Sequence, residues 1–143
     1  MGTLQQFEEI EAWQKARELT RAIYECSKSG EFERDYGLRD QMRRAAVSSM
    51  SNIVEGFERR GKGEFLQFLS IARGSAAEVA SHLYVALDQG YLSEAQFKEL
   101  HELTRSTINL VNGFISYLRS SPFQGEKYKI GKPLCRKSPD SEP

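Results

Sequence analysis

Residues 43–78 read RRAAVSSMSNIVEGFERRGKGEFLQFLSIARGSAAE, and this stretch decides the fold class. Its first half carries small residues and a polar file, whereas its second half is apolar on more than one side. Both halves have helical periodicity, and Gly61 and Gly63 separate them. The stretch contains no nucleophile–base pair, metal-ligand cluster or phosphate loop. It therefore predicts a helical bundle that packs against copies of itself, and it says little about a reaction.

Apolar residues recur every three or four positions along the rest of the chain, which predicts four helices and no strand. These helices are expected over about residues 7–28, 34 or 37 to 59, 65–89 and 93–118. Gly30 and Gly90 are expected to end the first and third helices, because a left-handed residue after a helix is usually glycine. Ser93 and Gln96 have the spacing of a capping box. Short loops predict an all-α, antiparallel up-down-up-down four-helix bundle over residues 7–121.

The two ends of the chain are expected to differ from the bundle. Residues 1–6 are predicted to be a flexible N-terminus, and residues 122–143, with several glycines and prolines, a disordered polar tail. Within the bundle, Trp13 is expected to be largely buried among Ile10, Leu38 or Met42, and residues of the fourth helix.

Size and composition indicate one domain. The chain has 143 residues, of which 39% are hydrophobic and 28% charged, as is typical of a soluble globular protein with a real core. Its formal net charge is zero, so no overall field draws it to nucleic acid or membrane. The N-terminus lacks a signal-peptide pattern, and the longest apolar run, residues 83–87, is too short to span a membrane. We therefore expect a cytoplasmic protein without membrane association.

The charge is unevenly placed along the chain. It is −3 over residues 1–33, +3 over 34–62, −2 over 63–121 and +2 over 122–143. A cyclic oligomer would repeat the basic second helix and build a ring of positive potential. Four interleaved carboxylates also allow ordinary surface arginines with partners in the same chain, and no aromatic–basic platform for single strands stands out. The candidate contacts to RNA or DNA are Arg39, Arg43, Arg44, Arg59, Arg60 and Lys62.

A polar file runs along the predicted second helix. At 100° per residue, its members fall within about 80° of one another; they are Arg44, Ser48, Asn52 and Glu55. One interpretation is a solvated face with an Arg-to-Glu pair. The other is a hydrogen-bonding strip buried between subunits, because Ser and Asn are poor helix formers on an exposed face. Gly56 favours the second interpretation slightly, since an interior glycine is unfavourable unless something packs closely over it.

The predicted third helix carries a second apolar file beside its core stripe. The file comprises Leu66, Ala77, Ala80 and Tyr84, with Arg73 among them. A helix in a monomeric bundle needs only one apolar stripe, so the second file would expose an apolar patch unless another chain covers it. A wide core stripe is the alternative explanation. The file favours self-association.

The two motifs R-R-A-A-V-S-S-M-S-N-I-V-E-G-F-E-R-R and E-F-L-Q-F-L-S-I-A-R-G-S-A-A-E closely resemble those of the 23S ribosomal RNA intervening-sequence proteins. The resemblance begins at Glu11-Ala12-Trp13, reaches Tyr91-Leu92, and covers roughly residues 7–120 with a weaker fourth helix. These are small bacterial four-helix-bundle proteins, named for reading frames in insertions within the large-subunit rRNA gene. Met50 departs from the family, which more often has Ile-Pro or a similar pair near this position.

The resemblance implies an antiparallel four-helix bundle that assembles as a ring-like homopentamer. It also implies kinship with the accessory proteins of diversity-generating retroelements, which bind nucleic acid and a reverse transcriptase. The family name records where some genes lie and does not establish rRNA binding.

An enzyme is the competing class, and the sequence favours it little. Glu78 and His82 are four residues apart, whereas ferritin-like metal sites repeat a Glu-x-x-His pair, and His101 has no matching partner. Cys26 fits a small core residue better than a nucleophile, and the glycines around Lys62 fit a helix connector. We expect no catalytic residue, no metal and no cofactor; a metal-dependent bundle enzyme is the least favoured alternative.

The sequence thus predicts a non-catalytic homo-oligomer that binds RNA or DNA through a basic face without sequence specificity. The alternative is a protein scaffold or accessory subunit, for example of a reverse transcriptase, with no nucleic-acid contact of its own.

Overall fold

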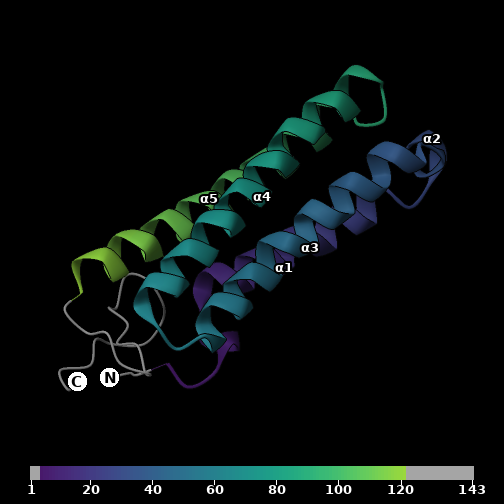
Figure 1. The fold of residues 1–143 in the computed structure, drawn as a ribbon. Coiled ribbons are helices and arrows are strands. Elements are labelled where there is room, and N and C mark those ends of the chain that lie inside the picture. Colours follow the sequence, from purple (N-terminus) through teal and green to yellow (C-terminus); the bar gives the residue numbers. More distant parts are fainter. Residues whose placement is uncertain (1–3, 122–143) are drawn as a thin grey trace.

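The computed structural model describes residues 4–121, and all regular secondary structure in that range is helical. Four long helices lie side by side (Figure 1): α1 (Glu11–Cys26), α3 (Tyr36–Glu58), α4 (Lys62–Asp88) and α5 (Glu94–Ser120). A 3-10 turn, η1 (Phe7–Glu9), precedes α1, and a short helix, α2 (Gly30–Arg34), joins α1 to α3. Both α1 and α4 pack against α3 and α5. The all-helical prediction is confirmed for the described range, and α2 is a fifth helix that the periodicity did not predict.

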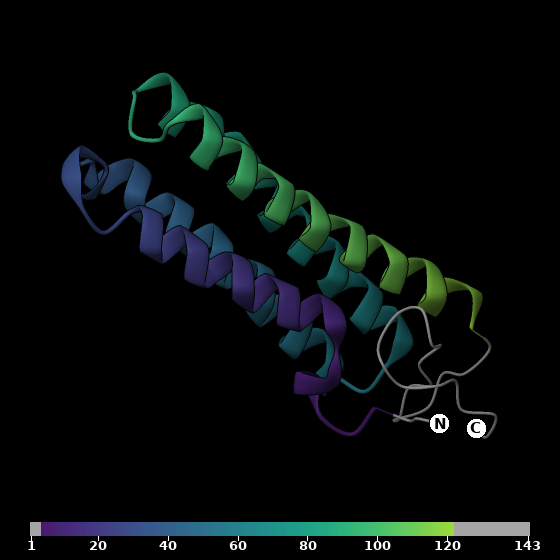
Figure 2. The ribbon, with the colours of Figure 1, turned by 180° about the vertical axis from the view of Figure 1, so that it is seen from behind.

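The connections lie at the two ends of the long helices. The turn from α3 to α4 lies at the end where η1 lies, and the loop from α4 to α5 lies at the other end beside α2 (Figure 1; Figure 2 shows the same arrangement from behind). At that second end, the Tyr91 hydroxyl donates to Asp35 Oδ2 at 2.9 Å, and this bond raises the pKa of Tyr91. Asp35 also caps α3 by accepting from the Leu38 N–H at 3.2 Å. One carboxylate therefore joins the start of α3 to the loop before α5.

Two predicted helix ends are confirmed. Gly90 has φ +78°, and the Tyr91 N–H donates to the Ala86 carbonyl at 2.9 Å, which is the Schellman ending of a helix. Ser93 and Gln96 form both bonds of a capping box at the start of α5.

The turn between α3 and α4 differs from the prediction. The later helix begins at Lys62, three residues before the expected Phe65, and Gly63 lies inside it. The left-handed residue of this turn is Arg60, with φ +65°, and neither glycine has a positive φ. Gly61 and Gly63 correctly predicted a turn between the two helices, but the start of α4 that was predicted from them was too late.

The core consists of two apolar clusters along the bundle. Trp13 belongs to the cluster that holds Ile10, where it is half-buried and its ring lies edge-on to Phe7 at 5.0 Å. The expected contacts of Trp13 with Leu38 or Met42 are wrong, because those residues belong to the other cluster. Leu4, in the segment predicted to be flexible, is buried in the first cluster. The predicted tail, 122–143, and residues 1–3 lie outside the described residues.

Helices α3 and α4 approach each other closely at Gly56, which is buried. A Cβ atom added there would lie 2.8 Å from Phe68 Cβ and 2.9 Å from Phe65 Cδ1. Close packing over this glycine was expected, and it comes from the same chain. Gly74, in the middle of α4, has no atom within 4 Å of an added Cβ.

We predict that Gly56→Ala lowers the free energy of unfolding by about 1–3 kcal/mol, because α4 must move away from α3. The matched variant Gly74→Ala should raise it by about 0.5–1 kcal/mol, since the helix gains propensity without a clash. Urea unfolding followed by circular dichroism measures both. Equal effects of the two substitutions would contradict the close approach at Gly56.

Candidate nucleic-acid interface

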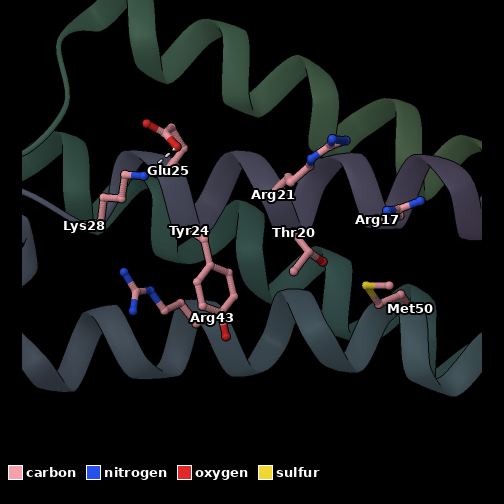
Figure 3. A pocket seen from close by; sticks show the side chains of 8 residues that line it. All are labelled: Arg17, Thr20, Arg21, Tyr24, Glu25, Lys28, Arg43 and Met50. Atoms are coloured by element: carbon pink, nitrogen blue, oxygen red, sulfur yellow. Dashed lines mark ion pairs between the residues drawn. The ribbon is translucent and has the colours of Figure 1, made fainter.

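Helix α1 buries one stripe of side chains, formed by Ala12, Ala16, Leu19 and Ile23. The residues on either side of that stripe therefore face the neighbouring helices, α3 on one flank and α5 on the other. On the α3 flank lies a groove of about 590 Å³ (Figure 3). It is lined by Arg17, Thr20, Arg21, Tyr24, Glu25, Lys28, Arg43 and Met50.

Arg43 closes one end of this groove and joins α3 to the end of α1. Its Nε donates to Ser27 Oγ at 2.9 Å, and its Nη2 donates to the Ser27 carbonyl at 3.1 Å. Ser27 is buried, so these bonds satisfy two oxygen atoms of Ser27 that water does not reach. The guanidinium carbon also lies 4.6 Å from the centre of the Tyr24 ring, within cation–π range. Arg43 is thus held in place by its own chain.

The floor of the groove is weakly polar. Thr20 Oγ1 lies within hydrogen-bond distance of the Ala16 carbonyl at 2.8 Å and of the Ala46 carbonyl at 3.0 Å, so its hydroxyl is already engaged. Met50 extends the apolar surface along α3. Figure 3 shows Thr20 and Tyr24 extending from α1 toward α3, whereas Arg21 points away from α3. The floor is therefore suited to an apolar or aromatic group.

The rim of the groove carries positive charge. Four cations line it, and the one carboxylate among the lining residues is Glu25. Glu25 pairs with Lys28 at 3.1 Å, but both side chains are well exposed, so the pair contributes little. Within residues 4–121, no hydrogen bond or ion pair engages the Arg21 guanidinium. The groove is a basic surface with an exposed aromatic side chain, Tyr24.

The opposite flank of α1 has the opposite charge. A second groove of about 590 Å³ lies between α1 and α5, and its lining includes Glu18, Glu25 and Glu99. Cys26 also lines it; burial raises the pKa of its thiol to about 11, against the opposing effects of a backbone hydrogen bond and Arg43. A protonated, half-buried thiol agrees with the expected packing role of Cys26. One helix thus separates a basic groove from an acidic one.

The six cations predicted to contact nucleic acid do not form one face. Arg39, Arg43 and Arg44 lie in the first part of α3, and Arg59, Arg60 and Lys62 lie at its far end. Twenty residues of helix separate Arg39 from Arg59, which is about 30 Å at 1.5 Å per residue. Of the six, Arg43 lines the basic groove.

The cations at the far end of α3 have partners in their own chain. Arg59 pairs with Glu55 at 3.1 Å and lies 5.0 Å from the Phe68 ring centre. Arg60 lies over Phe57 at 5.2 Å. Lys62 donates to the backbone carbonyl of Ser121. At the other end, Arg39 binds Asp40 and the Glu33 carbonyl, each at 3.0 Å.

The polar file of α3 bonds mainly within the chain. Ser48 Oγ and Ser75 Oγ lie 2.8 Å apart and join α3 to α4, and Asn52 Nδ2 donates to Ser48 Oγ at 2.9 Å. Glu55 is exposed and pairs with Arg59. The polar file therefore stabilises the α3–α4 contact. Its role as a subunit contact stays a prediction.

Arg44, the first member of the file, is exposed and lines a pocket of about 340 Å³ with Glu78 and His82. His82 Nδ1 is buried there without a hydrogen-bond partner in the described range. Within residues 4–121, no group of three or more His, Cys, Asp or Glu residues is placed to hold a metal ion. Nor is any helix in that range both long and apolar enough to cross a membrane.

The second apolar file of α4 lies largely against α5. Arg73 Nη1 donates to Asn112 Oδ1 at 2.9 Å, and the Tyr84 ring lies 4.9 Å from Phe97 and 5.5 Å from His101. Leu66 and Ala80 are half-buried, and Ala77 is exposed.

Beyond Ala77, the outer surface of α4 carries exposed apolar side chains. Ile71 is 46% exposed and Val85 is 42% exposed. These two residues were not predicted to be part of the file.

Three cations of the basic groove were not predicted from the sequence: Arg17, Arg21 and Lys28. Together with Tyr24 they are spaced by four, three and four residues, which places them on one side of a helix. That spacing was the available signal, but seven glutamates within residues 1–33 concealed it when charge was summed along the chain.

Comparison with known proteins identifies the family. The family model described as 23S rRNA-intervening sequence protein matches residues 8–113. The chain belongs to that family. Its structure is also similar to the crystal structure of a protein of unknown function from the S23 ribosomal protein family of Bacteroides thetaiotaomicron. That similarity has a TM-score of 0.66 at 20% identity, over 73% of this chain and 97% of the other, and it supports the fold alone.

The search among curated proteins finds no match. The resemblance expected from the two motifs is thus confirmed for the intervening-sequence family. Neither match provides a biochemical role, so the functional argument for this intervening-sequence protein rests on its own side chains.

Proposed function

We propose that this intervening-sequence protein is a non-catalytic homo-oligomer of the cytoplasm that binds the backbone of RNA or DNA in the α1–α3 groove. The observation that carries the proposal is the gathering of Arg17, Arg21, Lys28 and Arg43 around one groove. Phosphate contacts from Lys and Arg supply most of the affinity of non-specific nucleic-acid binding.

The length of the groove suits a short run of phosphates. Arg17 and Lys28 are eleven residues apart on or just after α1, which is about 16 Å at 1.5 Å per residue. At 3.4 Å per phosphate along one strand of a duplex, this distance corresponds to about five phosphates. The acidic groove on the other flank of α1 would repel the same ligand, so binding is directed to the α3 side.

The proposed binding tolerates many sequences. Contacts to phosphates position a protein but carry no direct sequence information. The groove offers charged tips, one phenol and an apolar floor, with no carboxamide among its lining residues to pair with a base edge. The cations at the α3–α4 turn already contact their own chain and are proposed to contribute less than the groove.

The proposal includes an antiparallel four-helix bundle assembled as a ring-like homopentamer, as the family resemblance implies. The outer surface of α4 supports self-association, because the apolar residues Ile71, Ala77 and Val85 are exposed there in a monomer. The competing function, an accessory subunit of another protein such as a reverse transcriptase, would use the same exposed residues to bind that partner.

Reversing both Arg17 and Arg21 to Glu should weaken retention of RNA and DNA by about tenfold or more at low salt, because two phosphate contacts become repulsive. The plot of log affinity against log salt should become less steep by about 1.4 for single strands. Fluorescence anisotropy across a salt titration measures both quantities.

The matched control reverses Arg59 and Arg60, which lie far from the groove at the α3–α4 turn. This pair should lose less affinity than the groove pair. If the unmodified protein shows no salt-sensitive retention of either nucleic acid, or if the control pair loses more, binding in the groove is refuted.

Ala77→Glu should dissociate the oligomer, because a carboxylate on the exposed surface of α4 would be buried without a partner in the interface. Ser106→Glu, at an exposed position of α5, should leave the oligomer intact. Multi-angle light scattering of the three proteins at micromolar concentration gives the mass of each. An unmodified chain that is monomeric there contradicts the proposal.

A further inference from the structure

We infer that the α1–α3 groove takes single-stranded rather than duplex nucleic acid, with one unpaired base stacked on Tyr24. This inference rests on the proposed function and names the ligand class of the same groove. The sequence alone indicated no aromatic–basic platform, and the fold assembles one from two helices.

The Tyr24 ring is held in position before any ligand binds. The Arg43 guanidinium lies 4.6 Å from the ring centre, and Arg43 is itself fixed by two hydrogen bonds to Ser27. Tyr24 nevertheless remains 43% exposed. Arg43 covers one side of the ring, which leaves the other side for an aromatic base to stack on.

The rest of the groove offers different surfaces to the base and to the phosphate of a nucleotide. Thr20 has an engaged hydroxyl, and Met50 is apolar, so the floor beside Tyr24 offers a base a surface that requires no hydrogen bond. Arg21 is exposed and points away from α3 (Figure 3), so a phosphate that it binds keeps its contact with water. Base and phosphate can therefore occupy the floor and the rim at once.

A duplex cannot use this arrangement without opening. Its bases are stacked on one another and present only their edges, whereas single strands expose base faces to aromatic side chains. Extruding a paired base requires unstacking and unpairing, which disfavours the duplex at a site that reads a base face. The groove charges alone would favour the duplex, because its phosphates are more densely spaced.

The test compares three fluorescent oligonucleotides: a mixed-sequence single strand, its duplex, and an abasic single strand of equal length. Binding is measured with the full chain at one low salt concentration. The single strand should bind more tightly than the duplex and the abasic strand. Tyr24→Leu should weaken single-strand binding by about 5- to 150-fold, the equivalent of one stacked base, whereas Tyr24→Phe should retain it.

The abasic strand also tests whether the groove stays intact in Tyr24→Leu, because it keeps the phosphates and lacks the bases. Its affinity should be the same for the unmodified protein and for Tyr24→Leu. Equal binding of strand and duplex, or an equal loss for the abasic strand, overturns the stacking inference while phosphate binding in the groove stands. Absence of salt-sensitive binding to all three refutes both proposals.

Discussion

The single buried stripe of α1 is the constraint on which the surface of this protein depends. Four small or aliphatic side chains, Ala12, Ala16, Leu19 and Ile23, fix the rotation of α1 between α3 and α5. Once that rotation is set, positions 17, 24 and 28 lie on the α3 side with Arg21 on the outer rim of the groove, and positions 18 and 22 face α5. Charges that alternate along the chain are thereby sorted into a basic groove and an acidic groove. A rotation by one residue, about 100°, would mix them.

The contact between Arg43 and the end of α1 joins the stability of the bundle to the shape of the basic groove. Hydrogen bonds from a charged group contribute about 1.5–3 kcal/mol, and an exposed cation–π contact adds about 0.5–1 kcal/mol. The hydrogen bonds contribute more than exposed ion pairs such as Lys28 with Glu25. Arg43 therefore keeps its position with or without a ligand, and the ring of Tyr24 is ordered in advance. Binding to an ordered site loses less conformational entropy than binding to a mobile one.

Local sequence signals predicted the fold well, and the surface was predicted less well. The Schellman ending at Gly90 and the capping box at Ser93 depend on a few adjacent residues, so both could be read from the chain. The start of α4 was misplaced because Arg60, and not a glycine, adopts the left-handed conformation. The six predicted cations lie on or just after one helix, but the two ends of a helix of 23 residues are too far apart for them to form one face. Arg17 and Arg21 were missed because a charge count along the chain ignores which side of a helix each residue occupies, and the pairing of α1 with α3 depends on contacts distant in sequence.

Photo-crosslinking to a single strand, followed by mass spectrometry of the linked peptides, tests the central claim most directly. A mixed-sequence RNA containing 4-thiouridine would be bound to the full, unmodified chain at low salt and irradiated. The account predicts that the linked residues lie in the basic groove, with Tyr24 prominent among them, and that added salt removes the links. Links concentrated in the acidic α1–α5 groove or at the α3–α4 turn, with none at Tyr24 or elsewhere in the basic groove, would contradict it.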